Sequence, residues 1–310
     1  MNKFFLKIFL FIILALSLIL AISILVTYLS FYVNDNSYFK SVYDKHQRLS
    51  NLKSPKIIIT GGSGCAYGIN SKKIEDSTGY NTVNMGVHAD FDYRYMLNEI
   101  KNSISKNDIV IFIPEYDLAA GDGNGDHELY DMLSCNPQSF RYLEFRQYLN
   151  FFSFFGKTTL INFRKIFKHP DTDRIYYRSA FNKEGDLISH LNRRSLFIDC
   201  NFIKGTCNPI YANSFIRFIT NFHEFCNSKK AILLYSFPAI AQSTFDSVNA
   251  NILYDKLRGN KINLIDKPID YVYCDTLFFN TNYHLTSYGR EMRTDKLVKN
   301  LRLFIKKNCN

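Results

Sequence analysis

Two short segments, far apart along the chain, carry the residues best suited to chemistry. The first is Lys56–Ser63 (KIIITGGS), an apolar β-branched run that ends in two glycines and a serine. The second is Asn280–Gly289 (NTNYHLTSYG), near the C-terminus, which contains His284. A serine hydroxyl becomes a nucleophile when a nearby base removes its proton, and histidine often serves as that base. The two segments therefore indicate nucleophilic catalysis by Ser63 with His284 as general base.

The runs around these segments predict a parallel sheet. Five short runs are expected to be strands, and helical stretches separate most of them. The runs are Lys56–Thr60, Asn81–Met85, Asp108–Pro114, Ala231–Ser236 and Asn263–Ile265. Alternating strands and helices are typical of α/β folds, in which reactive groups gather at the carboxyl ends of the strands. Ser63 follows the first run, and His284 precedes a closing helix expected over Ser287–Lys306.

The order of these features resembles the SGNH (GDSL-like) hydrolase superfamily. In that family the nucleophilic serine lies in Gly-Asp-Ser after the first strand, where this chain has Gly61-Gly62-Ser63. A second block carries a glycine whose N–H holds the oxyanion, and Gly86 follows the second run. The last block is Asp-x-x-His, and His284 stands at its histidine. The resemblance covers about 55–306 and implies an α/β, flavodoxin-like three-layer sandwich with a parallel sheet.

Three positions depart from the family pattern. Gly62 replaces the aspartate of the first block, and Thr281 stands where the aspartate of Asp-x-x-His is expected. The third block normally supplies an asparagine to the oxyanion, but here the third run is followed by Glu115 and Tyr116. Three alternatives stay open: backbone N–H groups suffice, Tyr116 replaces the asparagine, or the site is weak.

The resemblance implies that Ser63 is the nucleophile, that His284 is the base, and that the Ser63 and Gly86 N–H groups hold the oxyanion. Asn280 precedes His284 by four residues, so a turn there can return its amide oxygen to the ring. We therefore expect Asn280, and not Asp275, to orient His284. The expected oxyanion or substrate-binding residues are Gly62, Gly86, Tyr116 and His88.

The N-terminal segment predicts a membrane anchor. No charged residue occurs from Ile8 to Val33, and this length exceeds the roughly 20 residues that a helix needs to cross a bilayer. Its bulky end, Thr27–Val33, favours an uncleaved anchor over a signal peptide. We expect an anchor over 1–33, a stalk over 34–54 and an SGNH-like domain over 55–310, with a mostly helical insertion at about 118–228.

The charge and cysteine content limit the kinds of partner and cofactor that this protein is expected to bind. The chain has 38 Lys and Arg against 28 Asp and Glu, a formal charge of +10, without any run of five basic residues. Such a dispersed excess indicates a solvated surface, or attraction to an anionic membrane or polysaccharide, and no nucleic-acid motif accompanies it. None of the seven cysteines forms a Cys-x-x-Cys pair, so neither metal nor cofactor is expected. Cys200 and Cys207 either close a small loop by a disulfide or are unrelated.

Two functions are compatible with these residues. The first is a single-pass membrane serine esterase or O-acyltransferase that acts on acylated cell-envelope glycans through Ser63 and His284. Because membrane-tethered SGNH-like proteins usually work on envelope material, the resemblance implies a globular domain outside the cytoplasm. The alternative is a non-catalytic SGNH-like scaffold that binds a glycan, or a partner membrane acyltransferase, in envelope polysaccharide assembly. The departures from the family motifs favour this alternative.

Overall fold

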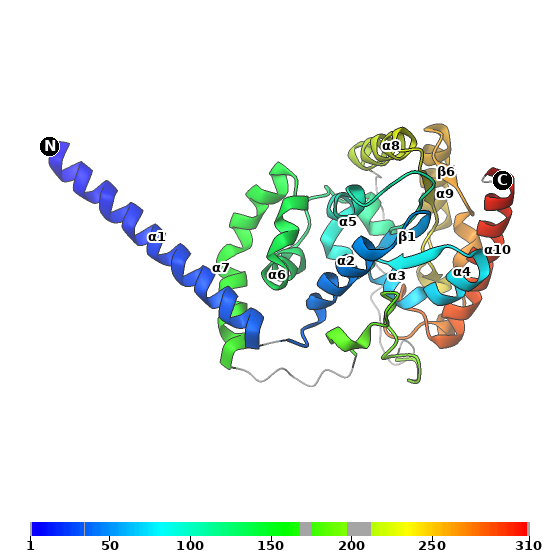
Figure 1. The fold of residues 1–310 in the computed structure, drawn as a ribbon, viewed down its shortest axis with the longest axis horizontal. Coiled ribbons are helices and arrows are strands. Elements are labelled where there is room, and N and C mark those ends of the chain that lie inside the picture. The colour runs from blue at the N-terminus through cyan, green and yellow to red at the C-terminus, as the bar shows by residue number, and fades with distance from the viewer. Residues whose placement is uncertain (1, 34, 168–174, 197–211, 309–310) are drawn as a thin grey trace.

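The computed structural model describes residues 2–33, 35–167, 175–196 and 212–308. Within them, a parallel sheet with the strand order β2-β1-β3-β4-β6 forms the centre of the body (Figure 1). Its strands are β1 Lys56–Gly61, β2 Asn81–Asn84, β3 Ile109–Ile113, β4 Ile232–Tyr235 and β6 Asn263–Leu264. The five strands predicted from the sequence are confirmed, most of them with slightly shorter ends. A small second sheet pairs β5 Ile240–Ala241 with β7 Val272–Tyr273.

Helices bury both faces of the sheet, which explains why β1 and β3 are mostly apolar on both faces instead of alternating. Ile58 of β1 packs in one core, whereas its neighbours Ile57 and Ile59 pack in the other. The first core includes residues of α2 Ser41–Asn51, α5 Asp92–Lys101, α8 Asn213–Ser228 and α9 Ser247–Gly259. The second includes α3 Ser63–Gly68, the start of α4 Ser71–Thr78, and α10 Ser287–Asn308, the expected closing helix.

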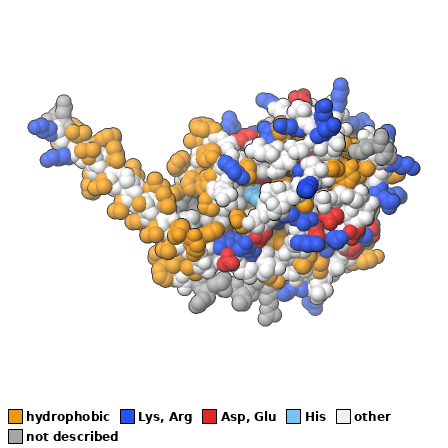
Figure 2. All heavy atoms as spheres, viewed as in Figure 1, with side chains coloured by type: hydrophobic (Ala, Val, Ile, Leu, Met, Phe, Trp, Pro, Cys, Tyr) orange, Lys and Arg blue, Asp and Glu red, His pale blue; other side chains and the backbone are white. Residues whose placement is uncertain are grey.

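Helix α1, Asn2–Val33, projects from the body (Figure 1). Among the described residues it is the one helix long and apolar enough to cross a membrane, and almost none of its most apolar part is buried. Space-filling atoms show hydrophobic side chains along its whole visible length (Figure 2). The predicted apolar helix is therefore present at the N-terminus.

The segment expected to be a stalk instead packs on the body. Helix α2 follows the short 3₁₀ turn Tyr38–Lys40, and its Val42 and Leu49 belong to the core. Lys45, on the same helix face, is buried and donates hydrogen bonds to the carbonyls of Asn84, Gly86 and Gly185. Positions 42, 45 and 49 recur at helical spacing, so this segment is an amphipathic helix of the domain and not a linker.

The insertion expected at about 118–228 is helical where it is described. Helix α6, His127–Cys135, and helix α7, Phe145–Phe167, lie side by side at the end of the body where α1 joins (Figure 1). Helix α8, at the end of the expected range, packs on β4 and so belongs to the layer that covers the sheet. Cys200 and Cys207 lie outside the described residues, so the proposed disulfide between them stays a prediction.

Candidate active site

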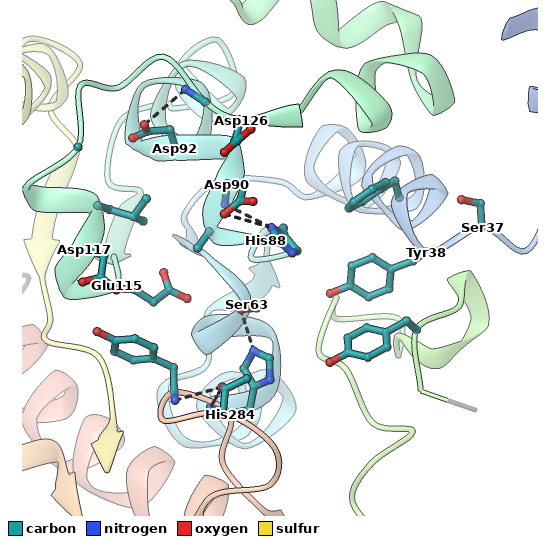
Figure 3. A pocket seen from close by; sticks show the side chains of 18 of the residues that line it. Ser37, Tyr38, Ser63, His88, Asp90, Asp92, Glu115, Asp117, Asp126 and His284 are labelled. Atoms are coloured by element: carbon teal, nitrogen blue, oxygen red, sulfur yellow. Dashed lines mark hydrogen bonds and ion pairs between the residues drawn. The ribbon is translucent and has the colours of Figure 1, made fainter. Parts of the chain in front are cut away.

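Ser63, His284 and Asn280 form a connected chain of hydrogen bonds. The Ser63 Oγ lies 2.8 Å from His284 Nε2, and His284 Nδ1 lies 2.8 Å from Asn280 Oδ1. Figure 3 shows His284 beside Ser63 at the bottom of a cavity. Two segments more than 200 residues apart in sequence are therefore brought together with the geometry of a nucleophile, a base and an orienting group.

A tight connection between β1 and α3 positions Ser63. The strand ends at Gly61 and the helix begins at Ser63, so the serine stands at the carboxyl end of a central strand. An added Cβ at position 62 would lie 2.3 Å from Glu115 Oε2, so a larger residue there would have to displace the Glu115 carboxyl group. Glycine at this position therefore leaves room for the present place of the Glu115 carboxyl group.

A turn over residues 279–284 positions His284 and Asn280. The Phe279 N–H donates to the His284 carbonyl at 2.7 Å, which closes the turn. The Thr281 hydroxyl accepts the His284 N–H at 3.1 Å, so threonine at the family's aspartate position holds the backbone instead of the ring. Asp275 accepts the Ser243 N–H at 3.1 Å. The prediction that Asn280, and not Asp275, contacts His284 is confirmed.

Tyr176 and Tyr67 fix the orientation of the pair. Asn280 Nδ2 donates to the Tyr176 hydroxyl at 3.0 Å, so the amide oxygen is the atom that faces the imidazole. An oxygen at that position accepts from Nδ1–H, which leaves Nε2 free to accept the Ser63 proton. The Tyr67 ring stacks on His284 with 3.8 Å between centroids and 2° between planes. The imidazole is thereby held in the tautomer that a general base requires.

His284 is a neutral base. Burial, together with the nearby His190 and His88 side chains, lowers its pKa to about 3. The neighbouring Asn280 has no charge with which to oppose this shift. The ring is therefore unprotonated at neutral pH and can accept a proton.

Two expected oxyanion groups have other partners. The Gly86 N–H donates to Asn84 Oδ1 at 3.0 Å, and an added Cβ at Gly86 would lie 2.5 Å from Cys65 Cβ. Gly86 thus allows close packing against α3, while its N–H serves the loop. Tyr116 is buried, with its ring 6.2 Å from that of Phe237, and is not among the described residues that line the cavity. The expectations that these two groups hold an oxyanion are corrected accordingly.

Glu115 is a residue of the site that the sequence alone did not reveal. Its buried carboxyl group accepts the Gly62 N–H at 3.1 Å and the Gly64 N–H at 2.7 Å, on either side of Ser63 (Figure 3). Burial raises its pKa to about 7, although the two amide hydrogen bonds oppose the shift. Gly62 and Glu115, which both differ from the SGNH motifs, are therefore structurally coupled, because the glycine leaves room for the glutamate carboxyl group.

The cavity beside Ser63 has a volume of about 1120 Å³. Tyr38 and Tyr176 line it, and His88 lines it as expected, with its Nδ1 accepting the Asp90 N–H at 3.3 Å. Ile161, Arg164 and Lys165 of α7 also belong to its lining. Its carboxylates are Asp90, Asp92, Glu115, Asp117, Asp122 and Asp126. The site therefore suits a sizeable polar substrate whose hydroxyl or amino groups donate hydrogen bonds.

One group of described side chains has the composition of a metal site. Asp126, His127 and Glu128 bring potential ligand atoms within 4.8 Å of one another, and Asp126 also lines the cavity. These oxygen and nitrogen ligands could hold a divalent cation. Ser63 and His284 form their hydrogen bond without taking part in this group.

Neither protein-family models nor curated proteins match this chain. The chemistry of the site is therefore inferred from its own geometry.

Proposed function

We propose that this protein is a membrane-anchored serine esterase or O-acyltransferase of the SGNH type, acting on acylated cell-envelope glycans. The observation that carries the proposal is the unbroken hydrogen-bond chain from Ser63 through His284 to Asn280, with 2.8 Å at each step. The strand order, with β1 between β2 and β3, supports a flavodoxin-like sandwich with the nucleophile outside the carboxyl end of the first strand.

The chemistry proceeds in two transfers. The Ser63 Oγ attacks the ester carbonyl while His284 Nε2 takes the hydroxyl proton, and a tetrahedral oxyanion forms. Collapse of this intermediate expels the alcohol, which receives the proton from His284, and leaves an acyl group on Ser63. His284 then deprotonates water or a glycan hydroxyl, which attacks the acyl group. The Ser63 oxygen leaves and takes the proton back from His284. Water gives hydrolysis, and a glycan hydroxyl gives acyl transfer.

The charge of Glu115 affects the stability of the oxyanion that forms beside Ser63. Its carboxyl group contacts the N–H groups on both sides of Ser63. In the ionised form it places a negative charge next to the developing oxyanion and opposes it, whereas the neutral form does not. We therefore assign the active state to neutral Glu115, which its raised pKa makes accessible near neutral pH.

The membrane-anchoring helix and the size and polarity of the cavity support an envelope glycan as the substrate. Helix α1 would hold the domain against a membrane. On this proposal the domain is on the extracytoplasmic side, where acylated envelope glycans lie. The cavity is large enough for a sugar unit with its acyl group, and its carboxylates can accept hydrogen bonds from sugar hydroxyls. A membrane-bound acyl donor or acyltransferase is the corresponding candidate partner.

One observation favours the alternative, a non-catalytic glycan-binding scaffold. The N–H groups of Gly62, Gly64 and Gly86, all beside Ser63, already have protein partners. A scaffold would keep the cavity and the buried Ser63–His284 contact for binding alone.

The test uses the full-length chain in detergent with short p-nitrophenyl esters and acetylated oligosaccharides as substrates. Ser63→Ala and His284→Ala should each abolish turnover, whereas Ser50→Ala, an exposed serine on α2, should retain it. Turnover in Ser63→Ala equal to that of the unmodified protein would refute the proposed nucleophile. Absence of turnover in all variants, with retained glycan binding, would establish the scaffold.

A further inference from the structure

Helix α7 carries large apolar side chains on its outward side as well as on the side where Phe151 and Phe154 pack against the core. Its buried positions include three polar residues, Gln147, Thr158 and Asn162. Its exposed positions include large apolar side chains, with Phe145, Phe152 and Phe167 between 73% and 75% exposed. A helix that packs on a soluble body buries its apolar side and exposes its polar side. The outward side of α7 therefore fits an apolar environment and not water.

The exposed apolar residues form one continuous stripe. They are Phe145, Leu149, Phe152, Leu160, Phe163 and Phe167. The successive steps of four, three, eight, three and four residues keep all six on the same side of the helix. At 1.5 Å per residue, the 23 residues of α7 make this stripe roughly 34 Å long. Single exposed apolar residues are common on proteins, but a stripe of this length marks an interaction surface.

A basic edge runs along the same stripe. Arg146, Lys157 and Arg164 are exposed, and their spacing of eleven and seven residues places them in one row beside the apolar residues. An apolar stripe bordered by Lys and Arg is the pattern of helices that lie in the interface of an anionic membrane. The charge of the edge thus selects a lipid surface with negative headgroups.

Helix α7 also contacts the membrane-spanning candidate α1. Ser23 Oγ lies 2.5 Å from Thr159 Oγ1, and Asn162 Nδ2 donates to Thr27 Oγ1 at 3.4 Å. These contacts lie in the last third of α1, whose 31-residue span Lys3–Val33 is roughly 46 Å long, more than a hydrocarbon core of about 30 Å requires. If the first 20 or so residues cross the core, α7 meets α1 where it emerges. Figure 2 shows hydrophobic side chains continuing from α1 onto the adjacent flank of the body.

We propose that α7 lies in the interface of the bilayer that α1 crosses, with its apolar stripe among the acyl chains and its basic edge against anionic headgroups. The inference rests on the proposed crossing by α1 and is independent of any chemistry at Ser63. It has a consequence for that site, because Ile161, Arg164 and Lys165 of the same helix line the cavity. The cavity then borders the membrane surface, where a membrane-attached acyl donor or glycan would reach it.

The test exploits the absence of tryptophan from this chain. Phe152→Trp places a single indole at the centre of the stripe of the full-length protein, reconstituted in phosphatidylcholine and phosphatidylglycerol vesicles. Lipids brominated at both shallow and deep positions of the acyl chains quench an indole that lies among them. Leu14→Trp on α1 provides the membrane-inserted reference. Val248→Trp on α9, a position as exposed as Leu14, at 68%, provides the water-exposed reference.

The indole at position 152 should lose most of its emission and shift to the blue, close to the reference on α1. Quenching no greater than that of the reference at position 248 would overturn the proposal, and would leave the stripe to a protein partner or a second copy. Phe163→Trp repeats the measurement should the first variant not fold. Esterase activity, measured in parallel, reports separately on the proposed chemistry.

Discussion

Replacing Asn280 by aspartate tests whether His284 works as a base whose imidazolium lacks a charged partner. The amide oxygen already lies 2.8 Å from Nδ1, so a carboxylate fits the same place. The Tyr176 hydroxyl, which now accepts from Asn280 Nδ2, can rotate and donate to the new carboxylate instead. At about 4 Å and an effective dielectric constant of about 20, the attraction for the imidazolium is about 4 kcal/mol.

Desolvation of the carboxylate removes much of this attraction, so we expect a net gain of about 1–2 kcal/mol. That gain corresponds to roughly a tenfold increase in kcat/KM at the maximum of the pH profile. The same attraction raises the pKa of His284 from about 3 toward neutrality. Because the base acts only when unprotonated, Asn280→Asp should lose activity as the pH falls through the raised pKa, whereas the unmodified protein keeps its base neutral there.

The assay is the pH dependence of p-nitrophenyl ester hydrolysis by full-length protein in detergent. Asp275→Asn is the control, since Asp275 accepts the Ser243 N–H and does not contact His284. This variant should leave both the maximal activity and the acid limb of the pH profile unchanged. A well-folded Asn280→Asp protein with a lower maximal activity, or with an unmoved acid limb, would refute the assigned role of Asn280.

Two further predictions concern Glu115. Activity of the unmodified protein should fall as the pH rises through about 7, where this carboxyl group ionises, while Glu115→Gln should keep its activity above that pH; parallel profiles would contradict the assignment. Gly62→Ala should lower the free energy of unfolding by about 1–3 kcal/mol. The alanine Cβ would displace the Glu115 carboxyl group from its hydrogen bonds with the two backbone N–H groups. Adding Glu115→Ala should recover part of that loss in urea denaturation, and strictly additive effects would show that the two positions are not coupled.

The strands and the Ser63–His284–Asn280 chain could be predicted because their signals are local. The central strands β1 and β3 are mostly apolar, β-branched runs, and in a parallel sheet the carboxyl ends of the strands share one edge. The contact between Asn280 and His284 follows from a turn of known reach within one segment. Residues 56–63 and 280–289 therefore contained most of the site.

Glu115 and the polarity of α7 depend on long-range contacts and could not be predicted in the same way. Glu115 matters because it meets the turn around Ser63, 52 positions away, and the sequence alone showed only that an asparagine was missing. Helical spacing in α7 marks an apolar stripe, but which side of the helix is buried depends on its contacts with α1 and α6. The segment 34–54 was misassigned because its apolar residues are few, although Val42 and Leu49 share a face with Lys45.

The most direct test of the central claim is covalent labelling of the full-length protein with a fluorophosphonate, which reacts with activated serines, followed by peptide mass spectrometry. We predict one adduct on Ser63, lost in His284→Ala and retained in Ser50→Ala. Absence of an adduct on Ser63 in the folded protein, or equal labelling in His284→Ala, would contradict the claim that His284 activates Ser63.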